Sequence, residues 1–230
     1  MKTLVIVSHP DILESSSQQY FLNSVPDKED VTIHHLEKTY PNGKIDVAKE
    51  QELLNQHDRI LFQFPFYWYS SPALLKHWQD EVLAYDFAHG KKGNALVGKE
   101  FGLILMIGVN ESDYQAGGKE QFSISELTKP YQAMAYKTGM IYLKPLSIFQ
   151  FSFMTEEEKM EMLVAYQQML TNENDSSLES REKWLIKQLK NTDKATLKSG
   201  DDTTLIHAID LIEENRETID ELKLVLEQMY

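Results

Sequence analysis

The 230-residue sequence contains no cysteine. Disulfides, thiolate metal sites and cysteine nucleophiles are therefore excluded, and a reducing compartment, the cytoplasm, is expected. Basic residues are also scarce, because 23 Lys and Arg stand against 36 Asp and Glu for a formal net charge of -13. A chain with so little positive charge is not expected to bind nucleic acid, whose phosphates need basic partners. No apolar run approaches the length that crosses a bilayer, so no membrane span is expected.

The sequence does contain a regular alternation of strand-like and helix-like segments. Five runs have the apolar composition of buried parallel strands: residues 2–8, 31–36, 58–64, 100–107 and 141–151. Amphipathic helical patterns lie at roughly residues 46–56, 72–83, 125–137 and 155–170. This alternation predicts an α/β fold with a doubly wound, five-stranded parallel sheet over residues 1–170.

The composition changes after residue 170. Residues 171–177 have the composition of a linker, residues 178–189 predict a short helix, and a second break at 198–202 precedes a long helix over 203–230. Apolar residues recur along this last helix at spacings of three and four and form a seam. The seam suits either a partner helix or the body of the protein's own domain. We assign residues 171–230 to a helical C-terminal extension.

A serine-rich turn follows the first strand. His9-Pro10-Asp11 ends the strand, and Ser15, Ser16, Ser17 and Gln18 open a helical pattern. At such a junction the free amides and the positive end of the helix dipole bind anions, and hydroxyl groups add donors. The same serines could instead act only as a helix N-cap.

An aromatic loop follows the third strand. Phe66, Tyr67, Trp68 and Tyr69 stand between two prolines, and the second, Pro72, suits the first turn of the following helix. Aromatic groups at the carboxyl end of a strand in an open α/β sheet suit a flat ligand. They could equally form a core cluster beneath the loop. With the glycine-containing loop after the fourth strand, we expect three loops to meet at one sheet edge: residues 8–17, 65–71 and 108–118.

Four sequence features are shared with a known family. They are His9-Pro10 with the serine loop, Tyr40-Pro41 with Ile45-Asp46 and Glu50-Gln51 downstream, the stretch over residues 63–80, and Gly108 with Glu111-Ser112. With these features the first 170 residues resemble the flavodoxin-like NAD(P)H:quinone oxidoreductases. The resemblance is to the bacterial branch that includes the ancillary oxidoreductase subunits of glutathione-gated potassium efflux systems. It implies a flavodoxin-like sheet that binds FMN, or alternatively FAD, at its carboxyl edge.

The resemblance also implies individual site residues. Those that would hold the flavin phosphate and ribityl chain are His9, Ser15, Ser16, Ser17 and Gln18. Those that would line the flavin ring are Phe66, Tyr67, Trp68 and Tyr69, and a third flavin loop would consist of Ile107, Gly108, Val109 and Asn110. Tyr114 stands where related quinone reductases place a tyrosine that assists hydride transfer, so it is the implied catalytic residue.

Two positions depart from the family pattern. The third flavin loop usually has successive glycines, whereas only Gly108 is present here. The histidine that usually follows the tyrosine is also absent, and Gly118-Lys119-Glu120 lies in its region. A tyrosine–histidine proton relay is therefore not expected.

The implied activity is transfer of two electrons, as hydride, from NAD(P)H through the bound flavin to a quinone-like acceptor. The resemblance further implies a homodimer with the flavin site near its interface, and a transporter as a candidate partner. The main alternative is a flavin-binding redox sensor, or a regulatory subunit of a transporter, with little turnover.

Two other classes are less consistent with the residues. A zinc-dependent amide hydrolase would use His9 and Asp11, but Ile12 stands where a second acidic residue is expected, and the seven histidines include no His-x-x-His pair. The adjacent His34 and His35 would point to opposite faces of a strand and cannot form a paired metal site. A one-electron carrier of the flavodoxin type does not stack a nicotinamide, for which the aromatic loop is suited.

Overall fold

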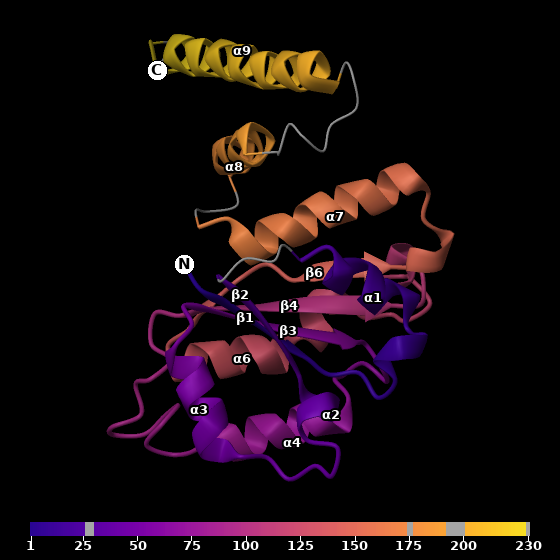
Figure 1. The fold of residues 1–230 in the computed structure, drawn as a ribbon, viewed down its shortest axis with the longest axis vertical. Coiled ribbons are helices and arrows are strands. Elements are labelled where there is room, and N and C mark those ends of the chain that lie inside the picture. Colours follow the sequence, from indigo (N-terminus) through magenta and orange to yellow (C-terminus); the bar gives the residue numbers. More distant parts are fainter. Residues whose placement is uncertain (26–29, 174–176, 192–200, 229–230) are drawn as a thin grey trace. The chain divides into compact units, whose positions relative to one another are not determined.

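The computed structural model describes residues 1–25, 30–173, 177–191 and 201–228 (Figure 1). The chain divides into two compact units, Met1–Thr171 and Asn172–Tyr230. The first unit contains the sheet, and the second contains the last two helices.

All sheet strands of the first unit pair in parallel. They are β1 (Thr3–Val7), β2 (Val31–His35), β3 (Arg59–Pro65), β4 (Glu100–Ile107), β5 (Ile141–Tyr142) and β6 (Leu146–Phe149). The strand order is β2-β1-β3-β4-β5, and β6 also pairs with β4. The predicted doubly wound parallel sheet is confirmed. The single fifth strand expected at 141–151 is instead split into β5 and β6. Pro145 lies in the gap, where it has no N–H to donate to the ladder.

Helices cover both faces of this sheet (Figure 1). The first unit contains α1 (Ser16–Asn23), α2 (Leu36–Thr39), α3 (Val47–Asn55), α4 (Ala73–Val82), α5 (Ile124–Leu127), α6 (Lys129–Thr138) and α7 (Glu156–Thr171). The helix expected at 125–137 is two helices, because Thr128 ends α5 and Pro130 lies in the first turn of α6. Gly139 caps α6 in the left-handed conformation, as the sequence predicts.

The core has one part on each face of the sheet. Leu4 and Ile6 of β1 pack with residues of α3, α4 and α6, while Val5 and Val7 pack with residues of α1 and α7. Successive side chains of a strand point to opposite faces, so a strand that is covered on both sides must be apolar throughout. This explains why the strands appear in the sequence as continuous apolar runs.

The second unit consists of α8 (Leu178–Lys190) and α9 (Asp201–Gln228). Trp184 of α8 and Ile209 of α9 are buried, and ion pairs join Lys190 to Glu213 at 2.9 Å and Glu182 to Arg216. Part of the predicted apolar seam of α9 therefore faces a helix of its own unit. Residues 174–176 of the expected linker, 198–200 of the expected break and 229–230 of the expected last helix lie outside the described residues. Asp201 and Asp202, which are expected in the break, belong to α9. None of the described helices combines the length and apolar character that a bilayer crossing requires.

Candidate functional site

The carboxyl ends of β1, β3, β4 and β6 border a cavity of about 220 Å³, which we call the loop-edge cavity. Its lining residues come from four loops and strand ends: His9, Ser15, Ser17, Pro65, Tyr67, Met106, Ile107, Gly108, Ile148, Gln150, Phe151, Ser152 and Phe153. The structure therefore brings together residues from all three loops that the sequence predicts at this edge. The segment Gln150–Phe153 is an additional wall that the sequence does not predict, since residues 150–151 are expected at the end of a strand and residues 152–153 are assigned no role.

The N-terminus of α1 opens toward this cavity through Ser15 and Ser17. Ser15 is the N-cap, and its hydroxyl oxygen accepts a hydrogen bond from the Gln18 amide at 3.4 Å. The first amides of a helix have no acceptor within the helix, so the amides of Ser16 and Ser17 are available to a ligand. Amides, hydroxyl groups and the helix dipole together make this corner suitable for a phosphate.

His9 adds a donor to the same corner. Its Nδ1 accepts a hydrogen bond from the Asp11 amide at 3.1 Å, so in the neutral ring the proton lies on Nε2. Burial lowers the pKa of His9, although Glu37 opposes this effect. At neutral pH we therefore expect an uncharged His9 that presents its Nε2–H as a hydrogen-bond donor.

Glu37 holds the His9 loop in place. Its carboxylate accepts hydrogen bonds from the Ser8 hydroxyl at 2.6 Å and the His9 amide at 3.0 Å, and His35 Nε2 lies 3.2 Å away. Burial raises the pKa of Glu37, but these hydrogen bonds outweigh burial and hold the pKa below its ordinary value. Sequence analysis missed this residue, because only the pairing of β1 with β2 brings it beside Ser8.

Gln18, which the sequence places with the phosphate-binding serines, is not among the lining residues of the loop-edge cavity and is fully buried. Its side-chain oxygen accepts a hydrogen bond from Gln63 Nε2 at 2.6 Å, and Gln63 Oε1 accepts one from Tyr166 at 2.9 Å. Among the described residues, Gln18 Nε2 has no hydrogen-bond partner. A buried amide donor without a partner is unfavourable unless a ligand or water satisfies it.

The aromatic loop divides between core and surface. Phe66 is 8% exposed and belongs to the core, whereas Tyr67 is 51%, Trp68 90% and Tyr69 42% exposed. The core-cluster interpretation therefore holds for Phe66 only. Tyr67 lines the loop-edge cavity, and Trp68 projects into solvent. Large exposed aromatic groups beside a cavity are suited to contact a flat ligand.

The third predicted loop is similarly divided. Ile107 and Gly108 line the loop-edge cavity, and Val109 packs against the core. A Cβ atom on Gly108 would have nothing within 4 Å, so the space beside its backbone is open. Asn110 borders a neighbouring cavity of about 310 Å³, which shares Gln150 and Phe153 with the first.

Tyr114 packs beside the aromatic loop. Its ring centroid lies 6.1 Å from that of Phe66 and 6.3 Å from that of Phe149. Burial raises the pKa of Tyr114, and the nearby Glu120 carboxylate raises it further. The phenol is therefore protonated at neutral pH and can donate a hydrogen bond.

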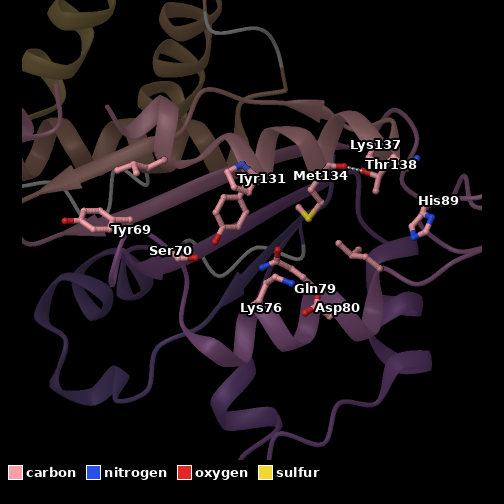
Figure 2. A pocket seen from close by; sticks show the side chains of 13 residues that line it. Tyr69, Ser70, Lys76, Gln79, Asp80, His89, Tyr131, Met134, Lys137 and Thr138 are labelled. Carbon is pink, nitrogen blue, oxygen red and sulfur yellow. Dashed lines mark hydrogen bonds and ion pairs between the residues drawn. The ribbon is translucent and has the colours of Figure 1, made fainter. Parts of the chain in front are cut away.

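A larger cavity of about 490 Å³ lies between α4 and α6 (Figure 2). Lys76, Gln79 and Asp80 line it from α4, and Tyr131, Met134 and Lys137 line it from α6. Tyr69 and Ser70 reach its edge, so the aromatic loop borders both cavities. No group of three or more His, Cys, Asp or Glu side chains that could hold a metal ion occurs in the described part of the chain.

Comparison with known proteins agrees with the sheet and its loops. The model of a family described by its flavodoxin-like fold matches residues 1–170. The NAD(P)H oxidoreductase YdeQ of Bacillus subtilis is 48% identical over 172 residues, which cover 75% of this chain and 87% of YdeQ. KefG of Yersinia enterocolitica, named as an ancillary protein of a glutathione-regulated potassium-efflux system, is 36% identical over 167 residues, which cover 73% of this chain and 89% of KefG.

Two solved structures extend the comparison. An NADPH-quinone reductase from P. pentosaceus is 44% identical, covers 76% of this chain and 100% of its own, and superposes with a TM-score of 0.71. General stress protein 14 of Treponema denticola, solved in complex with FMN, is 36% identical, covers 74% of this chain and 96% of its own, and has a TM-score of 0.67. The resemblance carried by the sequence motifs is confirmed.

Proposed function

The chain belongs to the flavodoxin-like NAD(P)H:quinone oxidoreductase family, and we propose that it uses FMN to transfer hydride from NAD(P)H to a quinone-like acceptor. The observation that carries this proposal is the meeting of a serine-rich helix N-terminus, which suits a phosphate, and an exposed aromatic loop around one cavity. A relative solved with FMN, 36% identical to this chain, supports the choice of cofactor.

The residues present fit the phosphate and ribityl chain of FMN. The amides of Ser16 and Ser17, the hydroxyl groups of Ser15 and Ser17, and His9 Nε2–H would hold the phosphate. Gln18 Nε2, for which the described part of the chain offers no hydrogen-bond partner, is a buried donor in the first turn of the same helix. All of these groups donate hydrogen bonds, as an anion requires.

The flavin ring would lie against Tyr67 and the open backbone at Gly108. Bound FMN would supply the redox chemistry, which is the transfer of two electrons as hydride from NAD(P)H to the acceptor. Phe66 and Val109 pack in the core and would support these loops from beneath. Trp68, Tyr69, Ile107, Gly108 and Asn110 would border the ring and exclude water from one side. Tyr114, held neutral, would donate a hydrogen bond at the ring or acceptor, where negative charge develops.

Acidic residues beside the site support FMN over FAD. Glu111, Glu158 and Glu161 line the neighbouring cavity, which shares two residues with the loop-edge cavity. FAD has a second phosphate and an adenosine group that would have to extend beyond the FMN position. If this extension entered the neighbouring cavity, the three carboxylates there would repel the second phosphate.

The rest of the proposal depends on the relatives. We infer a cytoplasmic homodimer, with Tyr67 and Trp68 near the interface, and NADH or NADPH as the donor. The KefG relative supports a second candidate function, a flavin-binding regulatory subunit of a transporter with little turnover. In that case the helical extension over residues 171–230 offers a surface for the partner.

An absorption spectrum of the purified protein tests the cofactor, followed by release and chromatography of the chromophore. We expect oxidised-flavin bands and released FMN, then rapid NAD(P)H oxidation with a panel of quinones. Flavin without turnover would favour the regulatory function. A colourless protein that takes up neither FMN nor FAD would contradict both.

A further inference from the structure

The tip of the aromatic loop is a strained turn. The Ser70 amide donates a hydrogen bond to the Tyr67 carbonyl oxygen at 2.9 Å, and the two residues between have positive φ, 46° at Trp68 and 62° at Tyr69. Two positive φ angles in a two-residue turn normally require glycine or asparagine. Bulky aromatic residues are unfavourable there, so neighbouring contacts must hold the turn in this conformation.

Glu120 provides such a contact from another loop. The Tyr69 hydroxyl donates a hydrogen bond to Glu120 Oε2 at 2.7 Å, across 51 positions in the sequence. A hydrogen bond to a carboxylate is roughly twice as strong as one between neutral groups. It is therefore strong enough to offset part of the strain at Trp68 and Tyr69.

Glu120 is itself fixed by a tightly folded loop. Its amide donates a hydrogen bond to the Asp113 carbonyl oxygen at 3.0 Å. Gly118 is essential to this fold, since a Cβ atom there would lie only 2.4 Å from the same oxygen. The carboxylate thus projects from a defined backbone position and does not simply follow the motion of Tyr69.

We propose that Glu120 is a positioning residue of the flavin site. Its hydrogen bond with Tyr69, which we call the latch, holds the Tyr67–Ser70 turn and so directs Tyr67 toward the loop-edge cavity. This inference rests on the proposed function. Tyr67 lines the cavity on one side of the turn, while Tyr69 is held by Glu120 on the other. When the latch opens, the strained turn relaxes and Tyr67 no longer stays where a flavin ring would contact it.

The same carboxylate acts on a second phenol. After burial, Glu120 is the largest cause that raises the pKa of Tyr114, and its hydrogen bond raises the pKa of Tyr69. Both phenols are therefore favoured in their protonated form.

Three variants test the latch. Tyr69→Phe removes the donor, Glu120→Ala removes the acceptor, and Glu120→Gln keeps an oxygen that can accept the same bond. Glu81→Gln, which removes one negative charge from an exposed position on α4, is the matched control. Hydrogen exchange of the peptide over residues 65–71, at short labelling times and without flavin, measures the turn itself. Fluorescence titration with FMN measures the consequence.

We expect Tyr69→Phe and Glu120→Ala each to speed exchange of this peptide and to raise the FMN Kd about tenfold, the scale of a lost hydrogen bond to a charged group. The double variant should add little, since both changes break one bond. Glu120→Gln keeps a weaker, neutral acceptor and should give values between those of Glu120→Ala and the unmodified chain. Glu81→Gln should match the unmodified chain.

The latch would be overturned if Tyr69→Phe and Glu120→Ala showed the same hydrogen exchange of this peptide and the same FMN Kd as Glu81→Gln. A chain that binds no FMN in any form would instead overturn the proposed function. Even then, the exchange measurement without flavin would decide whether Glu120 holds the turn.

Discussion

His34 and His35 are neighbours on β2, yet each faces a different carboxylate in a different environment. His34 Nε2 lies 2.9 Å from Glu50, whose side chain is fully buried. His35 Nε2 lies 3.2 Å from Glu37, which is partly exposed at the end of the sheet. Each pair consists of a histidine and a glutamate, but the His34–Glu50 pair lies inside the fold and the His35–Glu37 pair lies beside the candidate site. The comparison separates what holds the fold together from what holds the ligand site in shape.

The Glu50 cluster joins elements that are distant in sequence. Glu50 of α3 accepts hydrogen bonds from Tyr40 at 2.5 Å and from Trp78 of α4 at 2.8 Å, in addition to its contact with His34. This explains why Tyr40 and Glu50 belong to a sequence motif shared with the family. Neither residue lines any of the three cavities described above, so their role is structural. The Glu37 cluster, in contrast, ties down the segment that carries His9.

Replacing Glu50 is expected to have the largest effect on stability. Glu50→Ala leaves the Tyr40 hydroxyl and the Trp78 N–H buried without their acceptor, so the free energy of unfolding should fall by about 3–5 kcal/mol. Urea denaturation followed by circular dichroism measures it. Glu52→Ala, at an exposed position on the same helix, is the control and should change stability by less than about 0.5 kcal/mol. A loss of only that size in Glu50→Ala would show that the cluster is not structural.

Acid should weaken the fold mainly through the same cluster. Burial raises the pKa of Glu50, but hydrogen bonds from His34, Tyr40 and Trp78 outweigh it and hold the pKa below the ordinary value of 4.5. A carboxyl with a lower pKa in the folded state binds its proton more readily when unfolded. Its stabilisation is therefore complete above pH 4.5 and is lost as the pH falls through the folded pKa.

The free energy of unfolding, measured between about pH 6 and pH 3, checks this acid dependence, because carboxylates titrate in that range. In Glu50→Gln the fall in stability over that range should be distinctly shallower than in the unmodified chain. Glu37→Gln should flatten it less, because the Glu37 carboxylate is only partly withdrawn from water. Equal slopes in all three proteins would mean that other carboxylates dominate acid unfolding.

Much of this architecture could be predicted from the sequence, and the exceptions have physical causes. The β1, β3 and β4 runs are apolar because both faces are covered, which a single sequence reveals. The hydrophobic periodicity predicts one strand across Pro145 and one helix across Pro130, whereas the structure has two shorter elements at each place. The serine, aromatic and glycine loops were predicted to meet because parallel strands end at one edge.

The parts of the site that the sequence did not reveal depend on register. Val7 pairs with His35, so the residues that follow these two strands, including Ser8 and Glu37, lie side by side. Similarly, the Tyr69–Glu120 contact joins loops after β3 and β4. Contacts of this kind require the sheet order and loop conformation, which local patterns do not contain.

Replacing Glu37 is expected to have the smallest effect on stability and a distinct effect on binding. Glu37→Ala removes the acceptor of the buried Ser8 hydroxyl and of the His9 amide. Because the Glu37 side chain is itself 20% exposed, water can enter the space that it leaves, and the free energy of unfolding should fall by about 1 kcal/mol. Because His9 is then no longer fixed beside the α1 N-terminus, the FMN Kd should rise about tenfold, equivalent to about 1.4 kcal/mol. Removing a negative charge near a phosphate acts in the opposite direction, and at low salt it should reduce the loss. Titrations with FMN at two salt concentrations separate the two effects. A loss of FMN affinity, relative to the unmodified chain, that grows with salt identifies loop positioning. Tighter FMN binding at both concentrations would mean that Glu37 acts only through its charge.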